Sequence, residues 1–139
     1  MRFDKKRLSR EAVHAALQKA ERYRLLNEPL EAESICRDVL DADPGNVDAR
    51  IMLLLSLTDQ FDSGSGNDLA AARSVLGELA DSYQRTYYGG IICERWAKAL
   101  FARHAHGSGE AVHHWLSEAM KMYAAAEELR RPGDDDALL

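Results

Sequence analysis

The chain is poor in the residues that interrupt helices and in those that form covalent cross-links. Its 139 residues include three prolines, nine glycines and two cysteines, Cys36 and Cys93. Two cysteines supply neither a disulfide framework nor a four-cysteine zinc site, and such sparse use is typical of a reducing cytoplasm. The scarcity of proline and glycine, with alanine-rich runs between them, favours helices. We therefore expect an all-α protein that works in the cytoplasm.

The chain also lacks a long apolar run and an excess of positive charge. No apolar stretch approaches the roughly 20 residues that a membrane span needs. The basic start MRFDKKRLSRE is not followed by the apolar segment of a signal peptide. Eighteen basic and 23 acidic side chains give a net charge of −5, which argues against broad binding to nucleic acids or anionic membranes. We expect neither as a partner.

Capping and turn residues divide the chain into six predicted helices. Ser9 and Asn46 are good N-cap residues, and Pro29 suits a first helical turn, where its missing N–H costs nothing. Gly89 and Gly90 weaken the first turn of the fifth helix. The predicted helices cover about residues 9–26, 29–42, 47–61, 68–83, 87–103 and 110–130. Joined by short turns, they make three antiparallel αα-hairpins, at about residues 9–43, 46–83 and 87–130.

An alanine followed four residues later by a bulkier side chain recurs in the second helix of each predicted hairpin. The pairs are Ala32/Cys36, Ala72/Leu76 and Ala111/Trp115, and the three alanines are 40 and 39 residues apart. A fixed period in this range is typical of a helical solenoid. Because a small side chain lets two helices approach closely, we expect these pairs to be buried where helices cross.

The first hairpin resembles the tetratricopeptide (TPR) repeat family. Ala20 and Tyr23 stand at the family's small and aromatic positions, and the second helix has the pattern A-x3-C-x3-L-x3-P, made by Ala32, Cys36, Leu40 and Pro44. The junction VLDADPGNVDA is also similar, and the resemblance is good over residues 12–60 and looser beyond. It implies three hairpins stacked as a short right-handed solenoid over residues 9–131, between a basic arm (1–8) and an acidic tail (132–139). A plain helical bundle is the alternative.

The resemblance also implies a groove that binds a peptide or a partner helix, lined by the first helix of each hairpin. The implied lining is His14, Leu17, Glu21 and Arg24, then Asp48, Ile51, Leu55 and Thr58, then Ile91, Glu94, Lys98 and Phe101. The family's carboxylate-binding variety needs polar or basic groups where Leu17, Glu21 and Met52 stand. An apolar segment docked on Ile51 and Leu55 therefore fits better. The alternative is that these side chains belong to the core.

Four histidines crowd one predicted turn and raise the alternative of a small metal-binding protein. They are His104, His106, His113 and His114. Neighbouring side chains on a helix point about 100° apart, however, and neither H-E-x-x-H nor C-x-x-C is present. No serine or cysteine stands in a catalytic signature, and Cys36 lies at a packing position. We therefore expect a protein that is not an enzyme and holds no resident metal or cofactor.

The sixth predicted helix is apolar over more than one face. Ala111, Trp115, Ala119, Met122 and Ala126 make the stripe expected to pack on the fifth helix, whereas Val112, Leu116, Met120 and Tyr123 widen it. These last four are the candidate homodimer surface, because the terminal helix of a solenoid needs a polar outer face or a cap. A structural homo-oligomer is one alternative. Another is a capping helix that begins at Asp134 and is cut short here.

Overall fold

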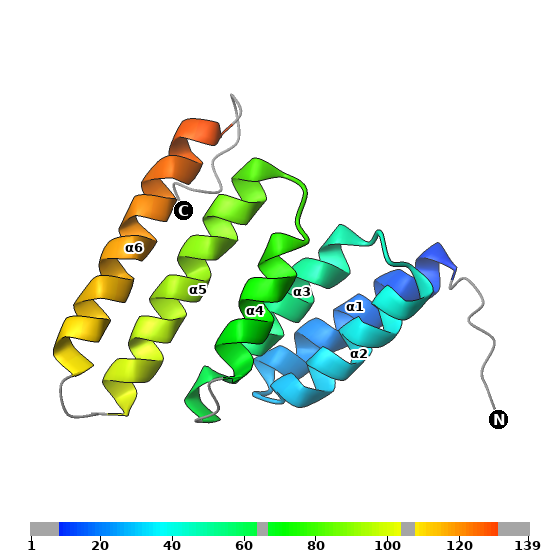
Figure 1. Cartoon of the computed structure of the whole chain (residues 1–139). Coiled ribbons are helices and arrows are strands. Elements are labelled where there is room, and N and C mark those ends of the chain that lie inside the picture. The colour runs from blue at the N-terminus through cyan, green and yellow to red at the C-terminus, as the bar shows by residue number, and fades with distance from the viewer. Residues whose placement is uncertain (1–8, 64–66, 104–107, 131–139) are drawn as a thin grey trace. The chain divides into compact units, whose positions relative to one another are not determined.

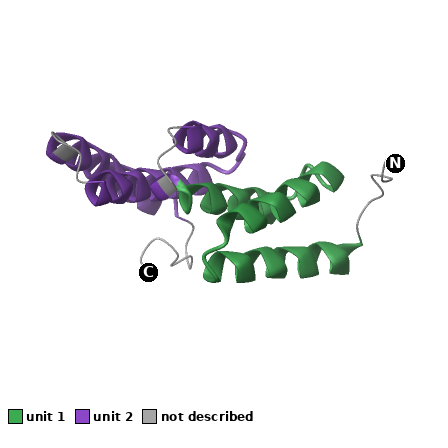
Figure 2. Ribbon diagram, turned by 90° about the horizontal axis from the view of Figure 1, so that it is seen from below, with its two compact units in different colours: residues 1–60 green, residues 61–139 purple. Residues whose placement is uncertain are grey.

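The computed structural model describes residues 9–63, 67–103 and 108–130 (Figure 1). Every regular element within those ranges is a helix, which confirms the all-α prediction. The chain divides into two compact units, Met1–Gln60 and Phe61–Leu139 (Figure 2). The predicted arm (1–8), the predicted tail (132–139), His104 and His106 lie outside the described residues. Among the described helices, none has the length and apolar character that crossing a membrane requires.

The first unit contains three helices that pack through small side chains. They are α1 (Arg10–Leu25), α2 (Pro29–Ala42) and α3 (Val47–Thr58). The middle helix, α2, packs against both of the others. Ala20, Ala32 and Cys36 are fully buried, and for Ala32 and Cys36 this agrees with their places in the alanine pattern. Leu54 of α3 is also fully buried, so this unit has an apolar core of its own.

The helices of the first unit begin where the capping residues predict. The Ser9 side chain accepts a hydrogen bond from the backbone N–H of Ala12 at 3.0 Å, and the Asn46 side chain accepts one from Ala49 at 2.8 Å. Pro29 occupies the first turn of α2. Each cap satisfies a backbone N–H that has no partner within its helix. Local hydrogen bonding therefore sets these boundaries.

The second unit is built around its two longest helices. Its elements are η1 (Phe61–Ser63), α4 (Asn67–Gly77), α5 (Ser82–Ala102) and α6 (Ser108–Leu129). α5 packs against α6 along their length and also contacts α4 and η1. Ala72 is fully buried, whereas Leu76, Ala111 and Trp115 are half-buried. Trp115 still makes a contact between helices, because the Arg73 guanidinium lies over its ring at 4.9 Å.

Three predicted boundaries differ from the structure. The fourth helix ends at Gly77 rather than near residue 83, and α5 begins at Ser82 rather than near residue 87. The reason is an unforeseen cap, because the Asp81 side chain accepts a hydrogen bond from the Gln84 backbone N–H at 2.8 Å. α3 ends at Thr58, and the unit boundary after Gln60 lies within the second predicted hairpin. The stacking of three hairpins as a solenoid stays a prediction.

Gly89 and Gly90 lie in the middle of α5, not in its first turn, and both are buried. They face α6 at very short range. A Cβ atom on Gly90 would lie 2.7 Å from the Tyr123 ring, and one on Gly89 would lie 2.9 Å from Met122 Sδ. Close packing of α5 on α6 therefore offsets the roughly 1 kcal/mol that each glycine costs in a helix interior.

Candidate partner-binding surface

The candidate surface lies on α1 and α3 of the first unit, which contact each other directly. Of the residues implied to line a groove there, His14, Glu21 and Asp48 are exposed. Leu17, Ile51 and Leu55 are half-buried. We call these six residues the α1–α3 face. It combines partly accessible apolar side chains with charged ones.

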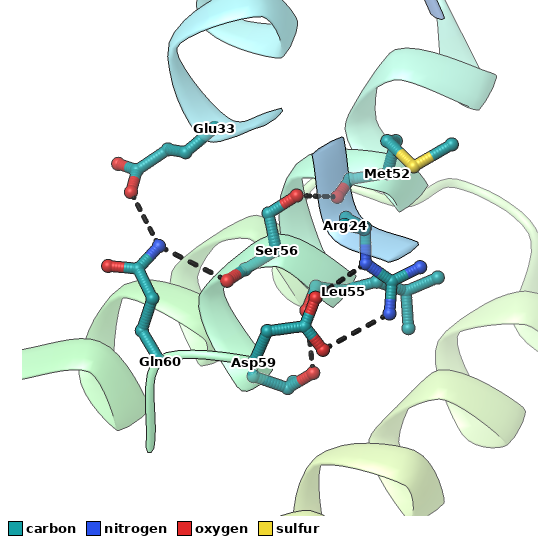
Figure 3. Close-up of polar contacts among 8 residues, drawn as sticks. Arg24, Glu33, Met52, Leu55, Ser56, Asp59 and Gln60 are labelled. Carbon is teal, nitrogen blue, oxygen red and sulfur yellow. Dashed lines mark hydrogen bonds and ion pairs between the residues drawn. The ribbon is translucent and has the colours of Figure 1, made fainter. Parts of the chain in front are cut away.

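An ion pair joins the C-terminal ends of the two helices and fixes their register. Arg24 Nε donates to Asp59 Oδ2 at 2.6 Å, and Nη2 donates to Oδ1 at 3.1 Å (Figure 3). The two side chains are 20% and 21% exposed, and Asp59 is the C-cap residue of α3. α1 and α3 therefore run in the same direction along this face. Leu17 lies two turns before Arg24, and Leu55 lies one turn before Asp59.

The bidentate pair also changes what Arg24 offers to a partner. Its guanidinium plane is held by a carboxylate across two hydrogen bonds, which is the strongest geometry for such a pair. The implied groove residue Arg24 therefore holds α1 to α3, and its charge is largely neutralised by Asp59. Among the six residues of the α1–α3 face, the carboxylates are those of Glu21 and Asp48, and both are exposed.

A second polar cluster binds the end of α3 to α2. Gln60 Nε2 donates to Glu33 Oε1 at 2.8 Å and to the Ser56 carbonyl at 3.1 Å (Figure 3). The Ser56 hydroxyl is fully buried and donates to the Met52 carbonyl at 2.8 Å. Buried polar groups that are hydrogen-bonded in this way specify the packing of helices. The arrangement is structural, and it holds the surface on α3 in place.

Thr58 was expected on the same face, and the structure places it elsewhere. Thr58 is only 4% exposed, and its hydroxyl donates a hydrogen bond to the Leu55 carbonyl at 2.7 Å. A residue so buried offers a partner no surface. The α1–α3 face therefore ends at Leu55 on α3.

The remaining implied groove residues lie on α5, in the second unit. Phe101 is 65% exposed, and Ile91 is half-buried. Glu94 accepts a hydrogen bond from the Tyr123 hydroxyl at 2.7 Å and pairs with Lys98 at 3.2 Å. The bond from Tyr123, more than the one from Lys98, holds the pKa of Glu94 below its usual value. A groove shared by both sets of residues stays a prediction.

Tyr123 was expected on the outer surface of the sixth helix, and this expectation is wrong. Its ring packs on Gly90 of α5, and its hydroxyl is bonded to Glu94. Burial, followed by the Glu94 carboxylate, raises the pKa of Tyr123 well above its ordinary value. The pattern of apolar residues could not show this, because the space for the ring is created by a glycine on another helix.

The histidines and cysteines do not assemble a site in the part of the chain that the structure describes. No group of three or more His, Cys, Asp or Glu side chains there is placed to hold a metal ion. His113 and His114 are exposed on α6. Cys36 and Cys93 are free and buried, and burial raises the pKa of Cys36 to about 12 and that of Cys93 above its usual value. Both sulfurs therefore act as apolar packing groups.

We expect both thiols of the folded protein to be nearly inert. Burial raises the pKa of both thiols and so favours the protonated form, whereas only the thiolate attacks a disulfide reagent. An aromatic disulfide reagent should label Cys36 and Cys93 more than about 100-fold more slowly in the native chain than in denaturant. Two equivalents should then react on unfolding, because the chain has two cysteines. A thiol that reacts rapidly in the native chain would contradict this assignment.

The chain matches no protein-family model, no curated protein sequence and no solved structure. Membership of the TPR family accordingly stays a prediction that rests on the first hairpin's own residues.

Proposed function

We propose that this chain is a non-catalytic protein-interaction module that binds one apolar side of a partner helix or peptide on the α1–α3 face. The observation that supports it is the combination of half-buried Leu17, Ile51 and Leu55 with exposed charged neighbours. Interfaces have this anatomy, with an apolar centre and a polar surround. The residues of this face were selected through the resemblance of the first hairpin to TPR repeats, and the support that the structure adds is their exposure.

The charge of the face favours one kind of partner. Glu21 and Asp48 are exposed, whereas the guanidinium of Arg24 forms an ion pair with the Asp59 carboxylate. A docked segment with apolar side chains on one side and Lys or Arg at its edges would complement this surface. The cytoplasm remains the proposed location, because both cysteines are free and buried.

The test is capture of partners from a cell extract, with identification by mass spectrometry. We expect Ile51→Glu combined with Leu55→Glu to reduce capture of the specific partner at least about tenfold, since it puts two charges in the apolar centre. The matched control is Leu26→Glu combined with Leu30→Glu. These leucines are 65% and 69% exposed near the α1–α2 turn, outside the α1–α3 face.

Helicity and thermal unfolding of each variant show whether the fold is retained. Leu17→Glu, on the other helix, provides an independent change to the same face and should also weaken binding. A set of captured proteins that is the same for the wild type, the control and both face variants would contradict the proposed function.

A further inference from the structure

The outer side of α6 carries an exposed apolar row in the second unit. Leu116 is 41% exposed, Met120 is 70% exposed, and Ala124 is exposed. The opposite side of the helix is covered, because Ala119 and Ala126 are almost fully buried. The row therefore differs from the predicted dimer surface. Tyr123 faces α5 and Val112 is half-buried, whereas Ala124 joins the exposed residues.

Charged and polar residues extend the row at both ends in a self-complementary order. His113 precedes Met120 by seven residues, Glu127 follows it by seven, and both are exposed. Leu116 and Ala124 lie four residues before and after Met120. Steps of three and four residues keep all five side chains on one stripe of the helix. The part of the stripe before Met120 thus carries His113 and the large Leu116, and the part after it carries the small Ala124 and the acidic Glu127.

We propose that a second copy of this chain covers this row, in an antiparallel dimer whose two-fold axis passes beside Met120. In that register Met120 packs on Met120 of the partner subunit. Leu116 packs on Ala124 of the partner subunit, so that a large side chain meets a small one. His113 donates a hydrogen bond to Glu127 of the partner subunit. The two-fold symmetry repeats each of these contacts, as it does in every isologous interface.

The side chains at the two ends of the row fit this occupant. A parallel pair would place His113 against His113 and Glu127 against Glu127, which the antiparallel pair avoids. A contact made by one helix from each subunit falls at the small end of specific interfaces. We therefore expect a dimer that dissociates in the micromolar range. This surface is separate from the α1–α3 face, so either proposal can fail without the other.

Analytical ultracentrifugation over protein concentrations from about 1 μM to 1 mM tests the dimer. The wild-type mass should rise from 15.5 kDa toward twice that value. Met120→Glu should weaken association at least about tenfold, because two carboxylates then meet at the axis. Leu25→Glu, a change at an 81% exposed leucine of the first unit, is the matched control and should leave association unchanged.

Two further variants test the register itself. Met120→Cys should form a disulfide-linked dimer under mild oxidation, since its two sulfurs meet at the axis and the native cysteines are buried. His113→Glu should weaken the dimer, and His113→Glu combined with Glu127→His should restore it. A wild type that is monomeric at every concentration overturns the proposal. So does a Met120→Glu variant that associates as strongly as the wild type.

Discussion

Replacing Phe61 with alanine should lower the free energy of unfolding of the second unit by about 3–5 kcal/mol, which is usual for removing a fully buried phenylalanine. Phe61 is 2% exposed, and its ring meets the ring of Trp96 edge to face, with centroids 5.3 Å apart. The truncation removes this aromatic contact and leaves a cavity beside α5. We expect a large drop in stability with retained helicity at low temperature.

The backbone at Phe61 is held to α5 by a separate contact. Arg103 Nη2 donates to the Phe61 carbonyl at 2.6 Å, and the guanidinium lies 5.1 Å from the centroid of the Trp96 ring. Phe61→Ala keeps this backbone hydrogen bond of η1. The stability that it loses is therefore that of side-chain packing. Both tryptophans of the chain, Trp96 and Trp115, lie in the second unit, so their fluorescence in a denaturant titration reports its unfolding.

Phe101→Ala is the matched control for this prediction. It removes the same side chain from the same unit, but Phe101 is 65% exposed. Its cost should stay below about 1 kcal/mol, as is usual at surface positions. Equal losses in the two variants would show that the packing of Phe61 on Trp96 does not stabilise the unit.

Gly90→Ala should destabilise the second unit by about 1–3 kcal/mol, although alanine is the better helix former. The new Cβ atom would lie 2.7 Å from a carbon of the Tyr123 ring. That ring is stiff, and its hydroxyl is bonded to Glu94, so it cannot move away without breaking a part-buried hydrogen bond. Denaturant titration followed by tryptophan fluorescence measures the loss.

Two other glycines separate crowding from helix propensity. At Gly89 the nearest atom to a new Cβ is Sδ of Met122, at the end of a flexible side chain. Gly89→Ala should therefore cost less than Gly90→Ala. At Gly109, in the first turn of α6, a Cβ meets nothing within 4 Å, so Gly109→Ala should be neutral or slightly stabilising. Equal effects at all three glycines would contradict the close approach of α5 and α6.

Helix boundaries were predictable where a short-range hydrogen bond sets them. Ser9 and Asn46 cap the helices that follow, and Pro29 begins α2, because these residues act on backbone groups two or three positions away. Asp81 gives the same signal for α5, but the two glycines that follow it favour a later helix start in the sequence. The glycines looked like helix breakers because their compensation comes from α6, more than 30 residues along the chain.

The candidate surface was less predictable than the helices, because it also depends on contacts between residues that are distant in the sequence. The resemblance to TPR repeats predicted Leu17, Ile51 and Leu55 on one surface, and the structure shows all three half-buried. It did not reveal that Arg24 is held by Asp59, which is 35 residues away. Nor did it show that Thr58 turns inward. Such details depend on how one helix is rotated against another, and no short pattern in the chain encodes that rotation.

The contact between Gly90 and Tyr123 should couple the residue types that positions 90 and 123 can accept as the sequence changes in evolution. A larger side chain at position 90 should fit better where position 123 carries a smaller one, and a tyrosine at 123 should favour a glycine at 90. The carboxylate at Glu94 extends the constraint, because its partner is the hydroxyl of the same tyrosine. We therefore expect substitutions at positions 90, 94 and 123 to occur together in related chains.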